Sequence, residues 1–283
     1  MAGRGVAVKR VDYAPDLFTA DALKFIRDHN RQPFFLYYAL NIPHANNEAG
    51  KAGMEVHDLG EFAAKDWPAP EKGFAKMIQN IDRDTGRIID LLRELKIADN
   101  TLVLFSSDNG PHHEGGHQPG FFNSNGPLKG HKRDLYEGGI RVPLIAYWPG
   151  RVKAGSVNDH ICAHWDLMPT FCELAKTSTP AHTDGISYVP ALTGGKQKKH
   201  DYLYWEFHSY GNAQAIRMGD WKAIRLKVKN NPNAPIQLYN LKQDIGETKN
   251  IAAAHPNVVK RIAPLFKEAH APSERFPLFA KKR

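Results

Sequence analysis

Hydrophobic residues along this chain follow two patterns, one typical of helices and one typical of buried strands. Residues 16–29 and 74–95 repeat apolar side chains at helical spacing, which predicts two amphipathic helices. Three short apolar runs, 34–40 (FFLYYAL), 101–105 (TLVLF) and 142–148 (VPLIAYW), are typical of strands covered on both faces. Helices that alternate with buried strands predict an α/β domain, with ligands bound beyond the carboxyl ends of parallel strands.

The pattern changes near residue 195. Residues 184–195 (DGISYVPALTGG) have the glycine and proline content of a loop, and we place a domain boundary there. Beyond it, four short strand-like runs are separated by turn residues, and a closing helix is predicted over residues 258–269. The runs cover residues 202–207, 214–218, 221–227 and 237–241. We therefore predict a main domain over residues 1–195 and a small antiparallel α+β subdomain over residues 196–283.

Two more segments connect these elements. Residues 46–72 are charged and irregular and contain the sequence WPAP, which predicts a surface loop. Residues 164–176 (HWDLMPTFCELAK) predict a further helix.

Composition places the chain among ordinary globular proteins. It has 283 residues, of which 42% are hydrophobic and 24% charged, and a formal net charge of +8. The basic residues are spread along the chain, apart from clusters at 196–199 and 281–283, so we expect no nucleic-acid partner. Cys162 and Cys172 form no disulfide framework and are predicted to be buried thiols. No segment is long and apolar enough to span a membrane, and MAGRGVAVKR at the start does not resemble a signal peptide.

Polar residues follow the apolar run 101–105. Asp108-Asn109-Gly110 is by itself a common tight-turn sequence. The next apolar run lies more than 30 residues away, however, which is too far for a hairpin. Carboxylate and amide oxygens are the ligands that Ca²⁺ and Mg²⁺ prefer. The pair is therefore a candidate metal site, and it needs further ligands from elsewhere because two cannot complete a six-coordinate shell.

Three other features carry possible chemistry, and each has a simpler alternative. His44 follows an apolar run, but a lone histidine is commonly structural or exposed. Lys132 lies among other basic residues in what could be a solvated loop. Glu137-Gly138-Gly139 is most simply a backbone turn in which the glycines take positive φ before a strand.

Taken together, these segments closely resemble the sulfatase family, most of all its arylsulfatase A type. The resemblance extends from about residue 15 to about residue 275, in the order and at the spacing of the family. The matching segments are FFLY (34–37), PH (43–44), SDNG (107–110), GHK (130–132), YEGGIRVP (136–143), residues 165–170, DGIS (184–187), residues 217–222 and residues 238–247. The resemblance implies an alkaline-phosphatase-like mixed sheet flanked by helices.

The resemblance also implies roles for single residues. Asp108 and Asn109 match two calcium ligands, and the two-zinc relatives of the superfamily typically have histidine at the second position. His44 matches the histidine that contacts the sulfate and protonates the leaving alcohol, a task that suits an imidazole. Lys132 matches the lysine that holds the sulfate, and a fixed cation there stabilises the charge of the transferring group.

One part of the family pattern is absent from these 283 residues. Sulfatases use a formylglycine made from the first residue of a C/S-x-P-S-R motif, and an Asp-Asp pair completes the calcium shell. Neither motif occurs here, and the residues after Cys162 and Cys172 do not fit. We therefore expect the chain to correspond to the carboxyl-terminal portion of a sulfatase, incomplete at its N-terminal side, with little or no activity by itself. By resemblance, the location is periplasmic or secreted.

The predicted function is the hydrolysis of sulfate esters with one bound Ca²⁺, and sulfated glycans are the candidate substrates. From their position we expect His112, His113 and His117 to contact the substrate. Two alternatives stay open. The chain could be a non-catalytic remnant that binds sulfated glycans through basic loops, or another hydrolase of the alkaline-phosphatase superfamily, such as a phosphonate monoesterase.

Overall fold

The computed structural model describes residue 9 and residues 11–280 of the chain. The expectations about the first ten residues, residue 9 apart, and about the basic cluster 281–283 lie outside these described residues. Within them, no helix has both the length and the apolar character needed to cross a membrane.

The chain divides into two compact units. The first contains the residues up to Leu102 together with His112–Phe122, and the second contains Val103–Pro111 together with the residues from Asn123 onward. The predicted boundary near residue 195 falls inside the second unit, and the division into domains at that point stays a prediction.

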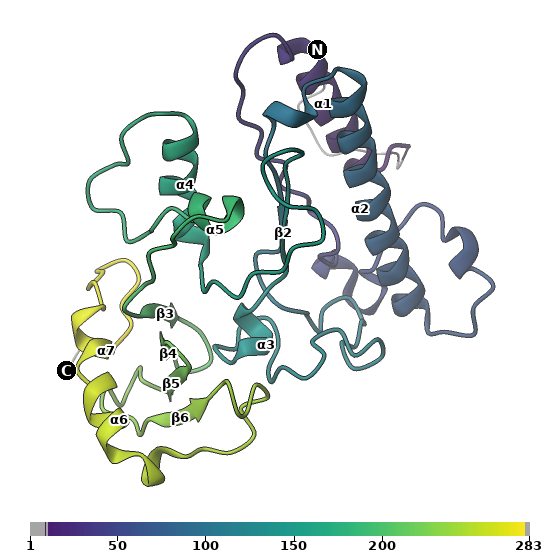
Figure 1. Cartoon of the computed structure of the whole chain (residues 1–283). Helices are drawn as coiled ribbons and strands as arrows, with labels where there is room; N and C mark the ends of the chain where they lie inside the picture. Colours follow the sequence, from purple (N-terminus) through teal and green to yellow (C-terminus); the bar gives the residue numbers. More distant parts are fainter. Residues whose placement is uncertain (1–8, 10, 281–283) are drawn as a thin grey trace. The chain divides into compact units, whose positions relative to one another are not determined.

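Two long helices form the first unit. α1 (Ala14–His29) and α2 (Ala69–Glu94) lie side by side (Figure 1) and bury Leu23 and Ile26 of α1 and Met77 and Leu92 of α2. Both predicted helices are confirmed, and α2 begins five residues earlier than predicted because Pro70 suits the first turn of a helix. The insertion before α2 is irregular, as predicted, apart from the 3₁₀ turns η1 (Asn47–Ala52) and η2 (Gly60–Phe62).

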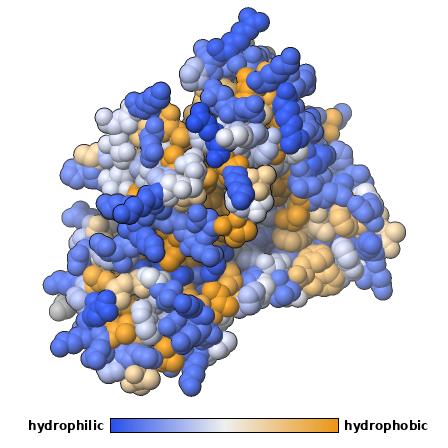
Figure 2. Space-filling view, viewed as in Figure 1, coloured by the Kyte–Doolittle hydropathy of each residue, from blue (hydrophilic) through white to orange (hydrophobic). Residues whose placement is uncertain are grey.

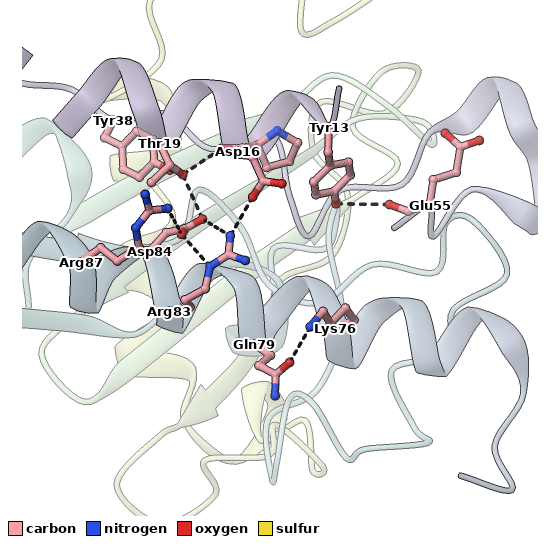
Figure 3. Close-up of polar contacts among 11 residues, drawn as sticks. Tyr13, Asp16, Thr19, Tyr38, Glu55, Lys76, Gln79, Arg83, Asp84 and Arg87 are labelled. Atoms are coloured by element: carbon pink, nitrogen blue, oxygen red, sulfur yellow. Dashed lines mark hydrogen bonds and ion pairs between the residues drawn. The ribbon is translucent and has the colours of Figure 1, made fainter. Parts of the chain in front are cut away.

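A buried carboxylate joins these two helices. Asp84 of α2 is 1% exposed, and Thr19 of α1 donates to it at 2.9 Å (Figure 3). Arg83 and Arg87 donate to the same carboxylate at 2.8 Å and 3.1 Å. Burial raises the pKa of Asp84, but hydrogen bonds from Arg83, Thr19 and Arg87 outweigh this and hold the pKa below its ordinary value. The hydroxyl of Tyr38 lies 2.6 Å from Thr19 Oγ1, so the cluster also contacts the segment that follows α1.

The prediction of a buried strand over residues 34–40 is wrong. The segment is extended, but it belongs to no strand among the described residues. Exposure alternates along it, with Phe35 and Tyr37 exposed and Leu36 and Tyr38 half-buried. A continuous apolar run gives no information about whether a neighbouring strand is present to accept its backbone hydrogen bonds. Figure 2 shows hydrophobic residues, in orange, reaching the surface in several separate places.

The apolar runs 101–105 and 142–148 do form strands in the second unit. β1 (Val103–Ser106) pairs with β2 (Leu144–Tyr147), with Val103 opposite Tyr147 and Ser106 opposite Leu144. The pairing is antiparallel, so the parallel arrangement assumed for this sheet is wrong. Periodicity predicts that a run is a strand but not the direction of its neighbour. The polar residues at the end of β1 nevertheless begin a long connection to β2 and do not form a hairpin turn.

A four-stranded antiparallel sheet forms the rest of the core of the second unit. Its strands, β3 (Leu203–Phe207), β4 (Ala213–Met218), β5 (Trp221–Leu226) and β6 (Gln237–Asn240), lie in sequence order, as the turn residues between them predict. Ile216, Ala223 and Leu238 pack against Ile262 and Phe266 of the closing helical segment. That segment is two helices, α6 (Pro256–Ile262) and α7 (Leu265–Glu268), because Pro264 cannot continue a helical hydrogen-bond ladder.

Short helices complete the second unit. The predicted helix 164–176 begins as the 3₁₀ turn η4 (His164–Asp166) and continues as α4 (Leu167–Leu174). The remaining short elements are α3 (Glu137–Ile140), α5 (Val189–Thr193) and the 3₁₀ turn η5 (Ala252–Ala254), while η3 (Ala98–Asn100) belongs to the first unit. Both cysteines are free thiols. Cys172 is buried, as predicted, whereas Cys162 is half-buried, and burial raises its pKa to about 11.

Candidate functional site

The turn that carries Asp108 and Asn109 is docked against α3. The backbone N–H of Gly110 donates to the carbonyl of Gly139 at 3.0 Å. A Cβ atom on Gly110 would lie 1.8 Å from the carbonyl oxygen of Gly138, so only glycine fits this close approach. The turn is therefore held by the second unit and does not behave as an isolated loop tip.

The side chains of this turn present oxygen atoms. The Asn109 amide nitrogen donates to the carbonyl of Gly110 at 2.9 Å, which leaves its side-chain oxygen available to another partner. Ser107 donates to the Asn109 carbonyl at 2.9 Å and fixes the backbone, and Asp108 is exposed. A carboxylate and an amide oxygen are hard donors that fit part of a calcium shell. In the part of the chain that the structure describes, no group of three or more His, Cys, Asp or Glu residues could hold a metal ion, so other ligands must complete such a shell.

The loop that carries Lys132 is held at the same place. The backbone N–H of Lys132 donates to the Pro111 carbonyl at 2.7 Å, directly after the Asp108 turn. The N–H of Gly138 in α3 donates to the Lys129 carbonyl at 2.7 Å. The structure thus holds the turn that carries Asn109 and the loop that carries Lys132 against one short helix, α3.

The Glu137-Gly138-Gly139 segment is not the positive-φ turn that we expected. It forms α3, and neither of its glycines has positive φ. The small residues are needed because the helix is tightly enclosed: a Cβ on Gly138 would lie 2.2 Å from the Gly130 carbonyl, and one on Gly139 would lie 2.2 Å from the Asp134 carbonyl.

Buried charges surround the start of α3, and the sequence analysis assigned them no role. Glu137 is 4% exposed; its carboxylate lies 2.8 Å from Lys222 Nζ and 3.2 Å from Arg217 Nη1. Glu247 is fully buried and accepts from the Glu137 backbone N–H at 2.6 Å. The sequence offered one indication of this cluster, a lysine inside the strand-like run 221–227, because a central strand buries a lysine only when an acidic partner is present.

The two carboxylates of this cluster titrate differently. Burial raises the pKa of Glu137, but the cations of Lys222, Arg217 and Arg141 outweigh burial and hold the pKa below its ordinary value. For Glu247, burial dominates and raises the pKa to about 7; Lys222 Nζ, 4.0 Å from its carboxylate, lowers the pKa but does not outweigh burial.

His44 lies in the first unit with both ring nitrogens facing oxygen atoms. Nδ1 is 2.7 Å from the Ala45 carbonyl, and Nε2 is 3.1 Å from a carboxylate oxygen of Glu114. The His44 side chain is 48% exposed. This arrangement suits a histidine that delivers a proton to a group arriving from solvent.

The three histidines predicted to contact substrate differ in their surroundings. His112 is buried; its Nδ1 accepts from the Glu114 N–H, so its Nε2 carries the proton that is donated to the Pro43 carbonyl at 2.9 Å. His117 is fully buried, with Nδ1 2.5 Å from Glu71 and its ring 3.8 Å from that of Phe74. His112 therefore supports the loop of His44, and His117 packs in the core. His113 is the exposed member, and substrate contact by any of the three stays a prediction.

Two sequence models of known protein families match parts of this chain. The sequence model of the Sulfatase family matches residues 7–177, and that of the N-sulphoglucosamine sulphohydrolase C-terminal region matches residues 130–270. N-acetylgalactosamine-6-sulfatase of Sus scrofa is 34% identical over 212 residues, covering 73% of this chain and 37% of that protein. N-acetylgalactosamine-6-O-sulfatase of Bacteroides thetaiotaomicron is 29% identical over 287 residues, covering 93% of this chain and 52% of that protein.

A solved structure shows the same fold. The crystal structure of Ps i-CgsB in complex with k-i-k-neocarrahexaose superposes with a TM-score of 0.79 at 30% identity, covering 94% of this chain and 56% of that one. The chain thus spans between 37% and 52% of the length of the two curated relatives above. The similarity of sequence and fold confirms the resemblance: this chain belongs to the sulfatase family of sulfuric ester hydrolases, within the alkaline-phosphatase-like superfamily.

Proposed function

We propose that this chain supplies one wall of an active site that hydrolyses sulfate esters of carbohydrates. The observation that carries the proposal is the docking of the Asn109 turn and the Lys132 loop on one helix, α3, inside a matched sulfatase sequence. Relatives named for N-acetylgalactosamine-6-sulfate, and a related structure holding a neocarrahexaose, support a sulfated saccharide as the substrate class.

Asp108 and Asn109 are the proposed metal ligands. The Asp108 carboxylate and the free side-chain oxygen of Asn109 would hold Ca²⁺ together with ligands from other residues. When bound, the ion supplies positive charge that stabilises the transferring sulfuryl group. The Lys132 ammonium adds a second fixed cation for the same group.

His44 is the proposed proton donor. The departing alcohol needs a proton as its bond to sulfur breaks, and the imidazolium of His44 can deliver it from Nε2. Glu114, 3.1 Å from that nitrogen, orients the ring.

The nucleophile is proposed to lie on residues other than these 283, because they contain no C/S-x-P-S-R sequence. We therefore expect the purified chain, given 4-nitrophenyl sulfate and Ca²⁺, to release no nitrophenol above the rate of buffer. Robust turnover that Lys132→Ala abolishes would contradict this proposal and place the nucleophile within the chain.

Two alternative functions give different results in binding assays. A sulfated-glycan-binding remnant would bind a sulfated oligosaccharide equally well with and without Ca²⁺, whereas a sulfatase wall binds it more tightly with Ca²⁺.

A solved phosphonate monoester hydrolase of Agrobacterium radiobacter shares only the fold, at 24% identity. Tighter binding of a phenyl phosphonate ester than of phenyl sulfate would favour that chemistry.

A further inference from the structure

A buried ion-pair network connects the four-stranded sheet to α3. Lys222 of β5 is fully buried, and its ammonium lies 2.8 Å from Glu137 Oε1. Arg217 of β4 donates to Glu137 Oε2 at 3.2 Å, and Glu247, just after β6, accepts the N–H of Glu137 at 2.6 Å. Three consecutive segments of the sheet region thus meet one residue of α3.

Burying the charges of this network costs free energy, so a contribution to the stability of the protein does not by itself explain why the network is present. Removing ions from water costs several kcal/mol per ion, and apolar residues of similar volume are often at least as stable. Apolar packing on the sheet is already present beside it, since Leu135 lies in the core with Ala215 and Ile224. Ion pairs with short, directed hydrogen bonds fix the orientation of α3 more narrowly than apolar contacts do.

The orientation of α3 determines where two proposed site segments lie. The carbonyl of Gly139 receives the N–H of Gly110, next to Asn109, and the N–H of Gly138 holds the Lys129 carbonyl at the start of the Lys132 loop. Because a Cβ on Gly110 would lie only 1.8 Å from the Gly138 carbonyl, a small shift of α3 must move the turn.

We propose that Glu137, Lys222 and Glu247 are positioning residues through which the C-terminal sheet sets the separation of the Asn109 turn and the Lys132 loop. This inference rests on the proposed function for its biological meaning. The C-terminal sheet then supports the active-site wall. The prediction of a separate C-terminal subdomain gave the sheet no such role.

Amide hydrogen exchange in the whole chain tests the inference without any need for activity. Glu137→Gln keeps the size and apolar packing of the side chain and removes its charge. We expect the N–H groups of Gly110 and Lys132 to exchange about tenfold faster in this variant, because the hydrogen bonds that protect them open more often. Unchanged exchange at both amides in a folded Glu137→Gln protein would overturn the inference.

Glu206→Gln is the matched control. Glu206 lies on β3 of the same sheet, and among the described residues the hydrogen bonds and ion pairs of its side chain are with His270 at 2.5 Å, His208 at 3.0 Å and Tyr204 at 2.7 Å, and none is with α3. It should lower the melting temperature without changing exchange at Gly110 or Lys132; equal acceleration in both variants would show a general loosening and overturn the inference.

Two further measurements keep the test decisive. If Glu137→Gln does not fold, Arg217→Met removes the outer cation of the network, which is 13% exposed, and the same two amides should exchange faster. Protection that stays unchanged in Arg217→Met overturns the inference. Phenyl sulfate binding by the unmodified chain is measured separately: if it is absent while the exchange pattern is as expected, the proposed function fails and the positioning of the wall stands.

Discussion

Gly110 shows how a single hydrogen atom in place of a side chain shapes the site. Alanine there would place its Cβ 1.8 Å from the Gly138 carbonyl, so the turn or α3 must shift. We expect Gly110→Ala to lower the free energy of unfolding by about 1–3 kcal/mol, as overpacked sites do. Urea unfolding measures this. Gly120→Ala is the control, because nothing lies within 4 Å of the added atom and its φ is not positive. Equal effects of the two substitutions would contradict the close docking.

Glu247 makes a prediction about pH. Its pKa is raised to about 7 by burial, so the folded chain binds a proton that the unfolded chain has lost above the ordinary value of 4.5. The contribution of this group to the free energy of unfolding therefore falls as the pH rises from about 4.5 to about 7 and stays low above that. Glu247→Gln keeps an acceptor for the Glu137 N–H and removes the titration.

Unfolding measured at about pH 5 and about pH 8 checks this prediction. The unmodified chain should lose stability relative to Glu247→Gln at the higher pH. The charged groups that face Glu247 are Lys222, Glu137 and Lys129. A difference between the two proteins that does not change with pH would show that Glu247 is ionised in the folded chain at both pH values.

At the scale of elements, the pair of helices α1 and α2 depends on one carboxylate. Asp84→Asn weakens the hydrogen bonds from Thr19, Arg83 and Arg87, and we expect a loss of about 2 kcal/mol, since hydrogen bonds to a charged group are the strong ones. Thermal or urea unfolding measures the loss. Asp90→Asn on the same helix is the control: its carboxylate is 75% exposed and pairs with Arg93 at 3.2 Å, so its loss should be below about 0.5 kcal/mol. A smaller effect at Asp84 than at Asp90 would contradict the role of the Asp84 carboxylate in joining α1 and α2.

Elements with a local signal were predictable from the sequence. α1, α2 and the strands β3 to β6 follow from apolar periodicity and from the turn residues between them, which act over a few positions. The segment 34–40 was predicted wrongly because a strand needs a hydrogen-bonding neighbour, and the sequence of the segment itself does not identify one. The direction of β2 relative to β1 was missed for the same reason.

The candidate site also contains residues that could be predicted from the sequence and residues that could not. Its first residues, Asp108, Asn109, His44 and Lys132, could be named because they belong to short sequence motifs. The charges that support them could not, since Glu137 and Lys222 lie 85 positions apart and only the fold brings them together. Equally, nothing local distinguishes buried His117 from exposed His113, four positions earlier.

At the scale of the whole molecule, the proposed function is that of a wall that binds a sulfate ester together with calcium. Asp108, Asn109 and Lys132 are the residues of the second unit that carry this claim, and α3 holds the two segments on which they lie. A wall of this kind has affinity for its ligands even where turnover needs other residues, because fixed cations attract the sulfate group before any bond is broken.

The most direct measurement is a calorimetric titration of the chain with phenyl sulfate, with and without Ca²⁺. We predict binding that Ca²⁺ strengthens, that Lys132→Ala weakens about tenfold or more, as the loss of a charge-assisted hydrogen bond does, and that Asp108→Ala makes independent of Ca²⁺. Lys153→Ala, which alters a lysine outside the site segments, should bind as the unmodified chain does. Binding that is unaffected by Ca²⁺, Lys132→Ala and Asp108→Ala alike would contradict the account.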